Sequence, residues 1–251
     1  MTAKKYLYGR YSFKVDIGKV RMNNEDRATA LTNSRGNILL VVCDGMGGQN
    51  KGDLAASLAI DTISQAFRDK ESFTNAFFAK RWVANVIREA NTEVYRQASK
   101  NEKYHGMGTT VTLVLIVNDY MIVAHVGDSR AYTFRNRILT QITEDQTYVQ
   151  YLYRIGEITK EEIATHPKRH VLMNALGIYP SLDLDVKSMP YMGDTILVCS
   201  DGLYNNVSEN DLLTIIKGTD SPDQKVNELV SLANNNGGSD NIAVVIWEAN
   251  K

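Results

Sequence analysis

Cysteine, proline and net charge are all scarce in this chain. Its 251 residues include two cysteines and four prolines, and 28 Lys and Arg stand against 29 Asp and Glu, which gives a formal net charge of −1. Cys43 and Cys199 each lie inside an apolar run, which indicates buried thiols in a reducing compartment and not a disulfide framework. Because a basic excess is missing, neither nucleic acid nor an anionic membrane is expected as a partner.

Long apolar runs and paired soft metal ligands are missing as well. No stretch approaches the roughly 20 apolar residues that cross a bilayer, and no apolar segment of a signal peptide follows the residues from Met1 to Tyr6. A cytoplasmic protein without a membrane segment is therefore expected. The sequence has no Cys-x-x-Cys pair, which disfavours zinc.

The order of strand-like and helical stretches predicts one α+β domain over residues 1–251, with two sheets and flanking helices. An apolar stripe of period four on the second helix is expected to be core. The region 143–185 has short helical pieces and a capping box at Thr159 and Glu162, so it is expected to be an appended subdomain. The expected strands are 11–17, 37–43, 110–117, 120–126, 130–134, 137–142, 194–199 and 242–247. Helices are expected to begin at Lys51, Ser208 and Ser221, and another is expected at 74–99. The apolar stripe on this second helix comprises Phe78, Trp82, Val86, Ala90 and Val94.

Acidic residues gather in four short islands at 23–26, 44–48, 200–202 and 239–241. Two of them follow apolar strands directly, as Cys43 is followed by Asp44-Gly45 and Ser200 by Asp201-Gly202. A strand that ends in Asp-Gly delivers a carboxylate to the rim of a sheet at a sharp turn. Repetition of this pattern in distant segments predicts a carboxylate cluster that holds hard cations such as Mg²⁺ or Mn²⁺. The candidate ligands are Glu25, Asp26, Asp44, Asp128, Asp201 and Asp240.

Each island alone is a weak signal, but their ordered set is specific. Taken together, the motifs resemble those of the metal-dependent Ser/Thr protein phosphatases of type 2C (the PPM family), and the Asp-Gly-Met-Gly-Gly form resembles the bacterial branch. The resemblance runs from about Ser12 to Trp247. The motifs are Arg21-Met22-Asn23-Asn24-Glu25-Asp26, Asp44-Gly45-Met46-Gly47-Gly48, Gly106-Met107-Gly108-Thr109-Thr110, Val126-Gly127-Asp128-Ser129-Arg130, Ser200-Asp201-Gly202-Leu203 and Ser239-Asp240-Asn241.

The resemblance implies two antiparallel β-sheets packed as a sandwich between helices, with a flap subdomain at about 143–185. It also implies two core cations and a third, weaker one. By this resemblance Asp44 would bridge both core cations, and the Gly45 carbonyl would contact one of them. Asp201 and Asp240 would bind the first cation, and Glu25 would contact the second through water. Asp26 would support the set, and Asp128 with Asp201 would form the third site.

The same resemblance assigns phosphate binding to Arg21, whose planar guanidinium suits the equatorial oxygens of a phosphomonoester. The alternative is a surface arginine that pairs with a neighbouring acid. Many eukaryotic relatives have a histidine as the suggested general acid where this chain has Met46, which has no proton to give. A water on a cation is then expected to protonate the leaving group. His125 is expected in the core, and a reach of His170 toward the third site is left as an open idea.

The leading hypothesis is a Mg²⁺- or Mn²⁺-dependent phosphoprotein phosphatase that acts on phosphoserine and phosphothreonine by a hydroxide between two cations. A Ser/Thr kinase and its substrates are the expected partners, and a monomer is expected. Two alternatives stay open: a relative without activity that serves as a binding module, and another two-metal hydrolase such as a phosphodiesterase or nuclease. The retained acids disfavour the first, and the lack of a basic stripe disfavours the second.

Overall fold

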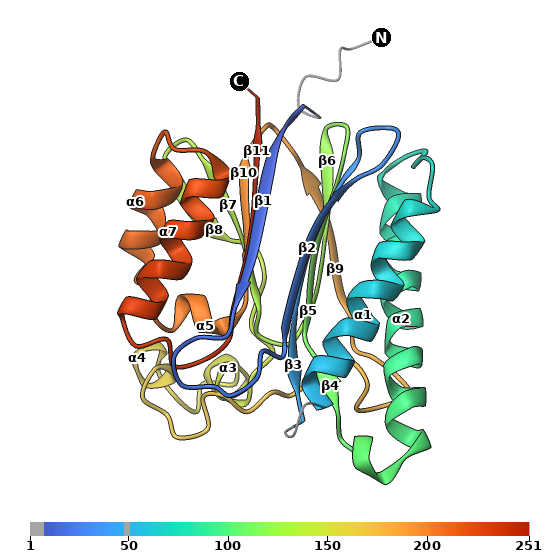
Figure 1. The fold of residues 1–251 in the computed structure, drawn as a ribbon, viewed down its shortest axis with the longest axis vertical. Coiled ribbons are helices and arrows are strands. Elements are labelled where there is room, and N and C mark those ends of the chain that lie inside the picture. Colours follow the sequence, from blue (N-terminus) through green and yellow to red (C-terminus); the bar gives the residue numbers. More distant parts are fainter. Residues whose placement is uncertain (1–7, 48–50, 251) are drawn as a thin grey trace.

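The computed structural model describes residues 8–47 and 51–250. Gly48, the last residue of the Asp-Gly-Met-Gly-Gly motif, and the start of the chain from Met1 to Tyr6 lie outside the described residues. Two antiparallel sheets pack face to face, and helices cover both outer faces (Figure 1). The predicted α+β sandwich is thereby confirmed.

The two sheets are built only from antiparallel neighbours. The first has the strand order β1-β11-β10-β7-β8, and the second has the order β2-β3-β5-β6-β9 with β4 paired to β3. The strands are β1 (Gly9–Asp16), β2 (Asp26–Thr32), β3 (Ile38–Met46), β4 (Gly108–Thr109), β5 (Val111–Val117), β6 (Tyr120–Val126), β7 (Arg130–Arg135), β8 (Ile138–Gln141), β9 (Asp185–Pro190), β10 (Thr195–Cys199) and β11 (Ile242–Ala249).

The helices begin where the sequence supplies caps. Ser208 and Ser221, the predicted starts of two helices, each accept a backbone N–H of the first turn, and Pro222 occupies the first position of the second helix. The predicted capping box of Thr159 and Glu162 is present too. The helices are α1 (Lys51–Arg68), α2 (Ala76–Lys100), the 3₁₀ turn η1 (Glu102–Tyr104), α3 (Tyr148–Arg154), α4 (Lys160–Ile163), α5 (Asp201–Tyr204), α6 (Glu209–Lys217) and α7 (Pro222–Asn235).

Three apolar clusters hold these layers together. One lies between the two sheets and includes Ile196 and Trp247. A second joins α1 and α2 to the outer face of the second sheet, and a third joins α6 and α7 to the outer face of the first. Burial of apolar surface on both faces explains why β3, β5 and β11 read as continuous apolar runs in the sequence.

The strand register brings the acidic islands to one end of the sandwich. Asp26, the first residue of β2, lies opposite Asp44 near the end of β3. The start of β5 pairs with the end of β6, directly before Asp128. In the other sheet, Cys199 at the end of β10 lies opposite Val244 near the start of β11. Segments far apart in the sequence therefore deliver their carboxylates to the lower end in Figure 1.

Besides the two-residue strand β4, strands β2 and β9 were not predicted from the sequence. Strand β2 has only one large apolar side chain, Leu31, because its inward positions carry the small residues Ala28 and Ala30. Strand β9 lies at a sheet edge and ends at Pro190, and edge strands tolerate proline and polar residues.

The structure also corrects two details. The strands expected at 130–134 and 137–142 predict a hairpin turn at Arg135 and Asn136, but the structure turns at Asn136 and Arg137, both with positive φ. This pair of left-handed residues is the two-residue turn that matches the twist of an antiparallel ribbon. On α2, Phe78 is 51% exposed and does not belong to the core, whereas Val86, Ala90 and Val94 are buried as expected.

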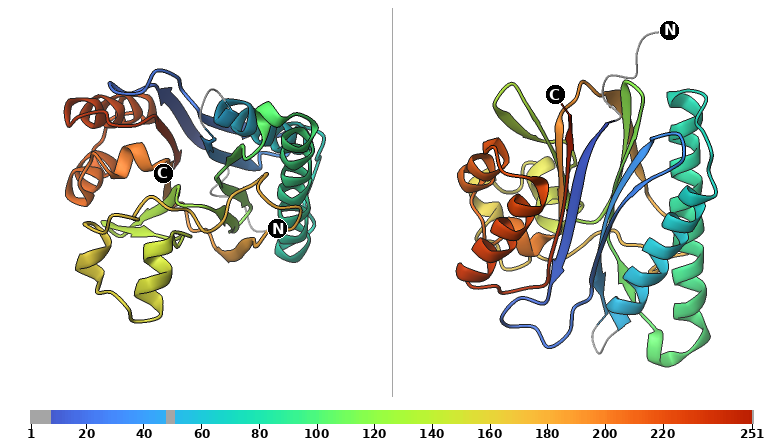
Figure 2. Two further views of the ribbon diagram at one scale, coloured as in Figure 1. Left: turned by 90° about the horizontal axis from the view of Figure 1, so that it is seen from below. Right: turned by 45° about the horizontal axis from the view of Figure 1, so that its top comes forward.

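The segment between β8 and β9 contains α3 and α4 and projects from the sandwich beside its lower end (Figure 2, left). Its return path is fixed to α2, where the buried Asn91 side chain donates to the carbonyls of Tyr179 and Pro180 and accepts from the Gly177 N–H. Within residues 8–47 and 51–250, no helix combines the length and the apolar character that a membrane crossing requires.

The apolar layer between the sheets is expected to dominate stability. Replacing Ile196, which is fully buried there, by alanine should lower the free energy of unfolding by about 2–5 kcal/mol, because a cavity adds to the lost transfer energy. Ile138→Ala is the matched control, since Ile138 is 63% exposed, and should change it by less than about 0.5 kcal/mol. Urea unfolding of both variants measures this; equal losses would contradict the assignment of the core.

Candidate active site

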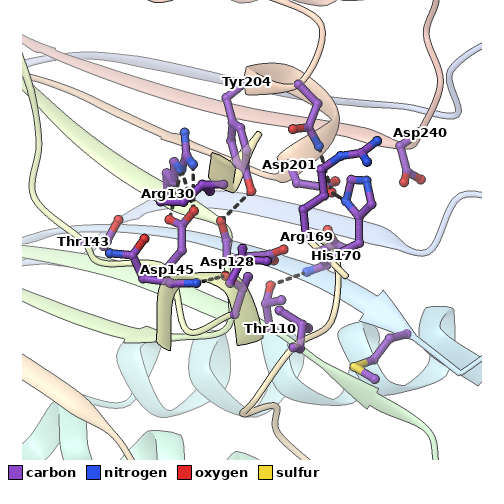
Figure 3. Close-up of a pocket in the computed structure, with 18 of the residues that line it drawn as sticks. Thr110, Asp128, Arg130, Thr143, Asp145, Arg169, His170, Asp201, Tyr204 and Asp240 are labelled. Carbon is purple, nitrogen blue, oxygen red and sulfur yellow. Dashed lines mark hydrogen bonds and ion pairs between the residues drawn. The ribbon is translucent and has the colours of Figure 1, made fainter. Parts of the chain in front are cut away.

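A single cleft of about 1400 Å³ at the lower end of the sandwich contains most of the predicted site residues. Figure 3 shows Asp128, Asp201 and Asp240 around the cleft, with Arg169 and His170 among them. The predicted residues that line the cleft are Arg21, Glu25, Asp44, Gly45, Asp128, Asp201 and Asp240, and Met46 lines it as well. Asp26 is the predicted residue that does not.

Asp44 is held through its backbone by two threonines. Its N–H donates to Thr110 Oγ1 at 2.9 Å, and its carbonyl accepts from the Thr110 N–H at 2.8 Å and from Thr109 Oγ1 at 3.0 Å. Thr110 Oγ1 lies 2.9 Å from Ser129 Oγ, next to Asp128. Asp44 lines the cleft, while its main chain is fixed by buried hydroxyls.

The two Asp-Gly pairs require glycine because other backbone segments pass against them. A Cβ on Gly45 would collide with the carbonyl of Gly52, and one on Gly202 would collide with the carbonyl of Asn241. The first approach packs α1 beside the end of β3. The second packs α5, which begins with Asp201, against the segment that carries Asp240.

Asp26 lies beneath the cleft and is 1% exposed. Its Oδ2 accepts a 2.6 Å hydrogen bond from Ser200 Oγ, which in turn accepts from the Ala243 N–H at 2.8 Å. This chain of contacts ties the start of β2 to β10 and β11 of the other sheet. Burial, followed by the charges of Asp201 and Asp240, raises the pKa of Asp26 to about 7.

Arg21 pairs with Asp240, its Nη2 lying 2.7 Å from Oδ2. The arginine side chain is 54% exposed, so this contact stabilises the fold by at most about 1 kcal/mol. The loop between β1 and β2 that carries it is fixed by Asn241, whose amide donates to the carbonyls of Ile17 and Asn23 and accepts from the Glu25 N–H.

Asp128 and Asp201 face the cleft from opposite sheets. Tyr204, at the end of α5, donates from its hydroxyl to the Asp128 carbonyl at 3.1 Å, and Asn205 donates to Asp201 Oδ2. His170 Nδ1 lies 3.9 Å from Asp201 Oδ2. The imidazole of His170 therefore lies within ion-pair distance of Asp201, one of the two acids of the implied third site.

The acids repel one another. Burial, and then neighbouring carboxylates, raise the pKa of Asp128 to about 8 and that of Asp201 to about 6, and they hold the pKa of Asp44 well above its usual range. Like charges that are close and buried disfavour ionisation, and an opposite charge removes that penalty. The site therefore has the electrostatics of a cation-binding centre.

The donor set fits hard divalent cations. All candidate side chains offer carboxylate oxygen, the Gly45 carbonyl adds another, and no cysteine or histidine belongs to the predicted set. As the side chains stand among residues 8–47 and 51–250, no group of three or more His, Cys, Asp or Glu is gathered closely enough to hold an ion. The carboxylates instead line the walls of one open cleft.

His125 and the two cysteines are buried in the core and do not line the cleft. His125 is 1% exposed, bonds to Thr112 Oγ1 at 3.0 Å, and has its pKa lowered to about 4 by burial, which confirms its expected place in the core. Cys43 and Cys199 are buried and free, as predicted.

Sequence reasoning missed three residues that position the acids: Thr110, Ser200 and Asn241. Each lies inside one of the motifs given above, but the sequence did not indicate that these residues position the acids by hydrogen bonds. Their roles depend on contacts with segments more than 40 residues away, such as Ser200 with Asp26 and Ala243. No local pattern of residues indicates such contacts.

Comparison with known proteins identifies the family of this chain. The family model described as protein phosphatase 2C matches residues 19–242. The serine/threonine phosphatase stp of Listeria monocytogenes is 35% identical over 237 residues, 94% of each chain. The structure of Stp1 from Staphylococcus aureus has a TM-score of 0.90 and 31% identity, with 97% of this chain and 96% of that chain covered. A structure of the PstP catalytic domain in complex with two manganese ions has a TM-score of 0.85 and 32% identity, with 97% and 99% covered.

The chain belongs to the protein phosphatase 2C family. It is an enzyme of that family, a protein serine/threonine phosphatase of the type found in bacteria.

The hold on Asp44 can be tested at Thr110. Thr110→Val keeps the shape of the side chain but removes the hydroxyl that bonds to the Asp44 N–H and the Ser129 hydroxyl. The free energy of unfolding should therefore fall by about 1–3 kcal/mol. Turnover of a phosphopeptide should fall about 10–100-fold, as for other groups that orient a site residue. Thr110→Ser keeps the hydroxyl and should stay near wild type. Steady-state kinetics with urea unfolding measure both; a fully active valine variant would contradict the assigned role.

Proposed function

We propose that this enzyme hydrolyses phosphoserine and phosphothreonine in proteins with Mg²⁺ or Mn²⁺, by means of a hydroxide between two cations. The observation that carries the proposal is the cleft in which Arg21 stands among candidate ligand acids from five separate segments. Hydrolysis of a phosphomonoester needs positive charge beside the phosphate oxygens and a water whose pKa is lowered by cations. Arg21 and this set of carboxylates suit both needs.

Asp44 is proposed to bridge two cations, with the Gly45 carbonyl on one of them. Asp201 and Asp240 hold the first cation, Glu25 acts through water on the second, and Asp26 supports the set from below. Asp128 with Asp201 forms a third, weaker site. When bound, the two core cations supply a water of lowered pKa and neutralise charge on the phosphoryl oxygens. The raised pKa values of the acids support these roles, because bound cations would restore their ionised form.

Arg21 is proposed to bind the phosphoryl group. Its guanidinium is always charged and offers paired donors that match two phosphate oxygens. In the structure these donors face Asp240 across an exposed contact, which a doubly charged phosphate can replace at small cost. The same side chain would thus anchor the substrate beside the acids that hold the cations.

The substrates are proposed to be phosphorylated proteins, with a Ser/Thr kinase and its targets as the signalling partners. The size and openness of the cleft suit a phosphorylated side chain on a protein surface, and residues 143–185 are proposed to form a flap along one wall, since Tyr153, Lys160 and Arg169 line it. A single domain over 1–251, acting as a monomer in the cytoplasm, is part of the same proposal; the free, buried Cys43 and Cys199 suit a reducing compartment.

Cation dependence tests the proposal directly. Hydrolysis of p-nitrophenyl phosphate should require Mn²⁺ or Mg²⁺, stop in excess chelator and return when the cation is restored. Asp201→Asn should lower kcat about 100-fold or more, because it removes a charge from the first cation site. Asp61→Asn, a change at an exposed acid of α1, is the matched control and should be neutral. Activity that persists in chelator, or in Asp201→Asn, would sink the two-cation account; no turnover with any divalent cation would favour a binding module.

Met46 tests the source of the leaving-group proton. Met46 lines the cleft but cannot donate a proton, so the proposed proton source for the leaving alkoxide is a water on a cation. Met46→Leu preserves volume and should leave kcat on a phosphothreonine peptide within about threefold of wild type. A loss near a thousandfold in the same assay would refute this view of the proton source.

A further inference from the structure

Three side chains form a cluster beside the cleft and join β7, α5 and the start of the flap. Arg130 Nε and Nη2 bond to the two carboxylate oxygens of Asp145 at 3.0 and 2.7 Å. The guanidinium carbon of Arg130 also lies 3.6 Å from the ring centroid of Tyr204. One planar cation therefore makes a forked ion pair along its edge and a stacking contact on its face, as Figure 3 shows.

Asp145 stands where the chain leaves the first sheet for the flap. Gln141 donates to Asp145 Oδ1 at 3.1 Å. The next residue, Gln146, donates from its N–H to the Gly127 carbonyl at 2.7 Å, and its side-chain oxygen accepts from the Gly127 N–H at 3.1 Å. The flap thus starts from a point fixed on one side to the turn before Asp128 and on the other to Arg130.

Tyr204 connects this point to the acids. It lies three residues after Asp201 on α5, and its hydroxyl donates to the carbonyl of Asp128. The ring that supports Arg130 therefore belongs to the same short helix that presents Asp201 to the cleft. A shift of Arg130 would act first on the start of the flap, to which Arg130 bonds directly, because α5 is packed separately through Gly202 against the carbonyl of Asn241.

The far part of the flap returns over the acids. Lys160, Arg169 and His170 line the same cleft as Asp44, and His170 lies near Asp201. A phosphopeptide whose phosphate sits at the acids has to pass beside these flap residues. A small phosphate ester lacks the flanking peptide that would contact the flap beyond His170.

We propose that Arg130 is a positioning residue that fixes the flap to α5, so that the flap wall of the cleft is formed before a phosphopeptide binds. The inference rests on the proposed function for the place of the phosphate. Arginine is required because a lysine ammonium cannot bond both oxygens of Asp145 and stack on Tyr204 at once. The cluster acts through the flap and not on the phosphoryl group, so it discriminates between large and small substrates.

The test compares Arg130→Lys with a matched control on the same strand. Arg135 lies at the other end of β7 and makes a forked pair with Asp194, so Arg135→Lys removes an equivalent contact away from the cleft. Arg130→Lys should raise KM for a phosphothreonine peptide about tenfold or more and leave kcat/KM for p-nitrophenyl phosphate within about threefold, as expected for a group that preorganises binding. Arg135→Lys should change neither substrate.

A second readout needs no turnover. Amide hydrogen exchange of residues 144–153, measured in chelator, should be faster in Arg130→Lys and in Asp145→Asn than in wild type, and unchanged in Arg135→Lys. Asp145→Asn keeps the size of the side chain and serves if the arginine variant does not fold. The two lesions should also be non-additive in the double variant, because each breaks the same contact.

The outcomes separate this inference from the proposed function. Wild-type exchange in the flap of both variants, or an equal loss on peptide and small ester, would overturn the role of Arg130 while the cation account stood. Wild-type protein with no cation-dependent turnover would defeat the proposed function, yet the exchange data would still decide whether Arg130 holds the flap.

Discussion

The structure depends on one arrangement that is costly by itself: carboxylates from several segments face one another at the end of a sandwich. Asp26 and Asp44 are opposite each other in register, and Asp201 is close enough to raise the pKa of both. Repulsion between such groups favours separation of the strands that carry them. The apolar layers between and outside the sheets supply the stability that keeps these strands together.

The support around the acids is made mostly of neutral groups. Hydroxyls of Thr110 and Ser200 and the amide of Asn241 hold the main chain or the buried carboxylate in place without neutralising it. Had lysines filled these positions, their charge would have satisfied the acids and competed with a cation for them. Hydrogen bonds from neutral groups fix the positions of the carboxylates without neutralising their negative charge. That charge then stays available to bind a cation.

Much of this could be read from the sequence, and the limits have physical causes. Acids placed directly after apolar strands predicted a cluster because the end of a strand is fixed by its sheet, and the motif order predicted the family. Strand β2 was missed because its inward residues are alanines, which give no strand signal, although β2 carries Asp26. The contacts of Ser200 with Asp26, and of Arg130 with Tyr204, join residues that only the fold brings together. Spacing along the chain has no information about them.

Arg21 and Arg130 both line the cleft, but their different exposure and partners suit them to different roles. Arg21 is 54% exposed and has one acidic partner, so its donors can exchange that partner for a ligand at small cost. The Arg130 side chain is 23% exposed, is bonded to both oxygens of Asp145 and lies on the ring of Tyr204. Its removal would leave a half-buried carboxylate without its partner, which is far more costly than the loss of a surface pair. The exposed guanidinium is therefore suited to bind and release, and the enclosed one is suited to hold elements in place.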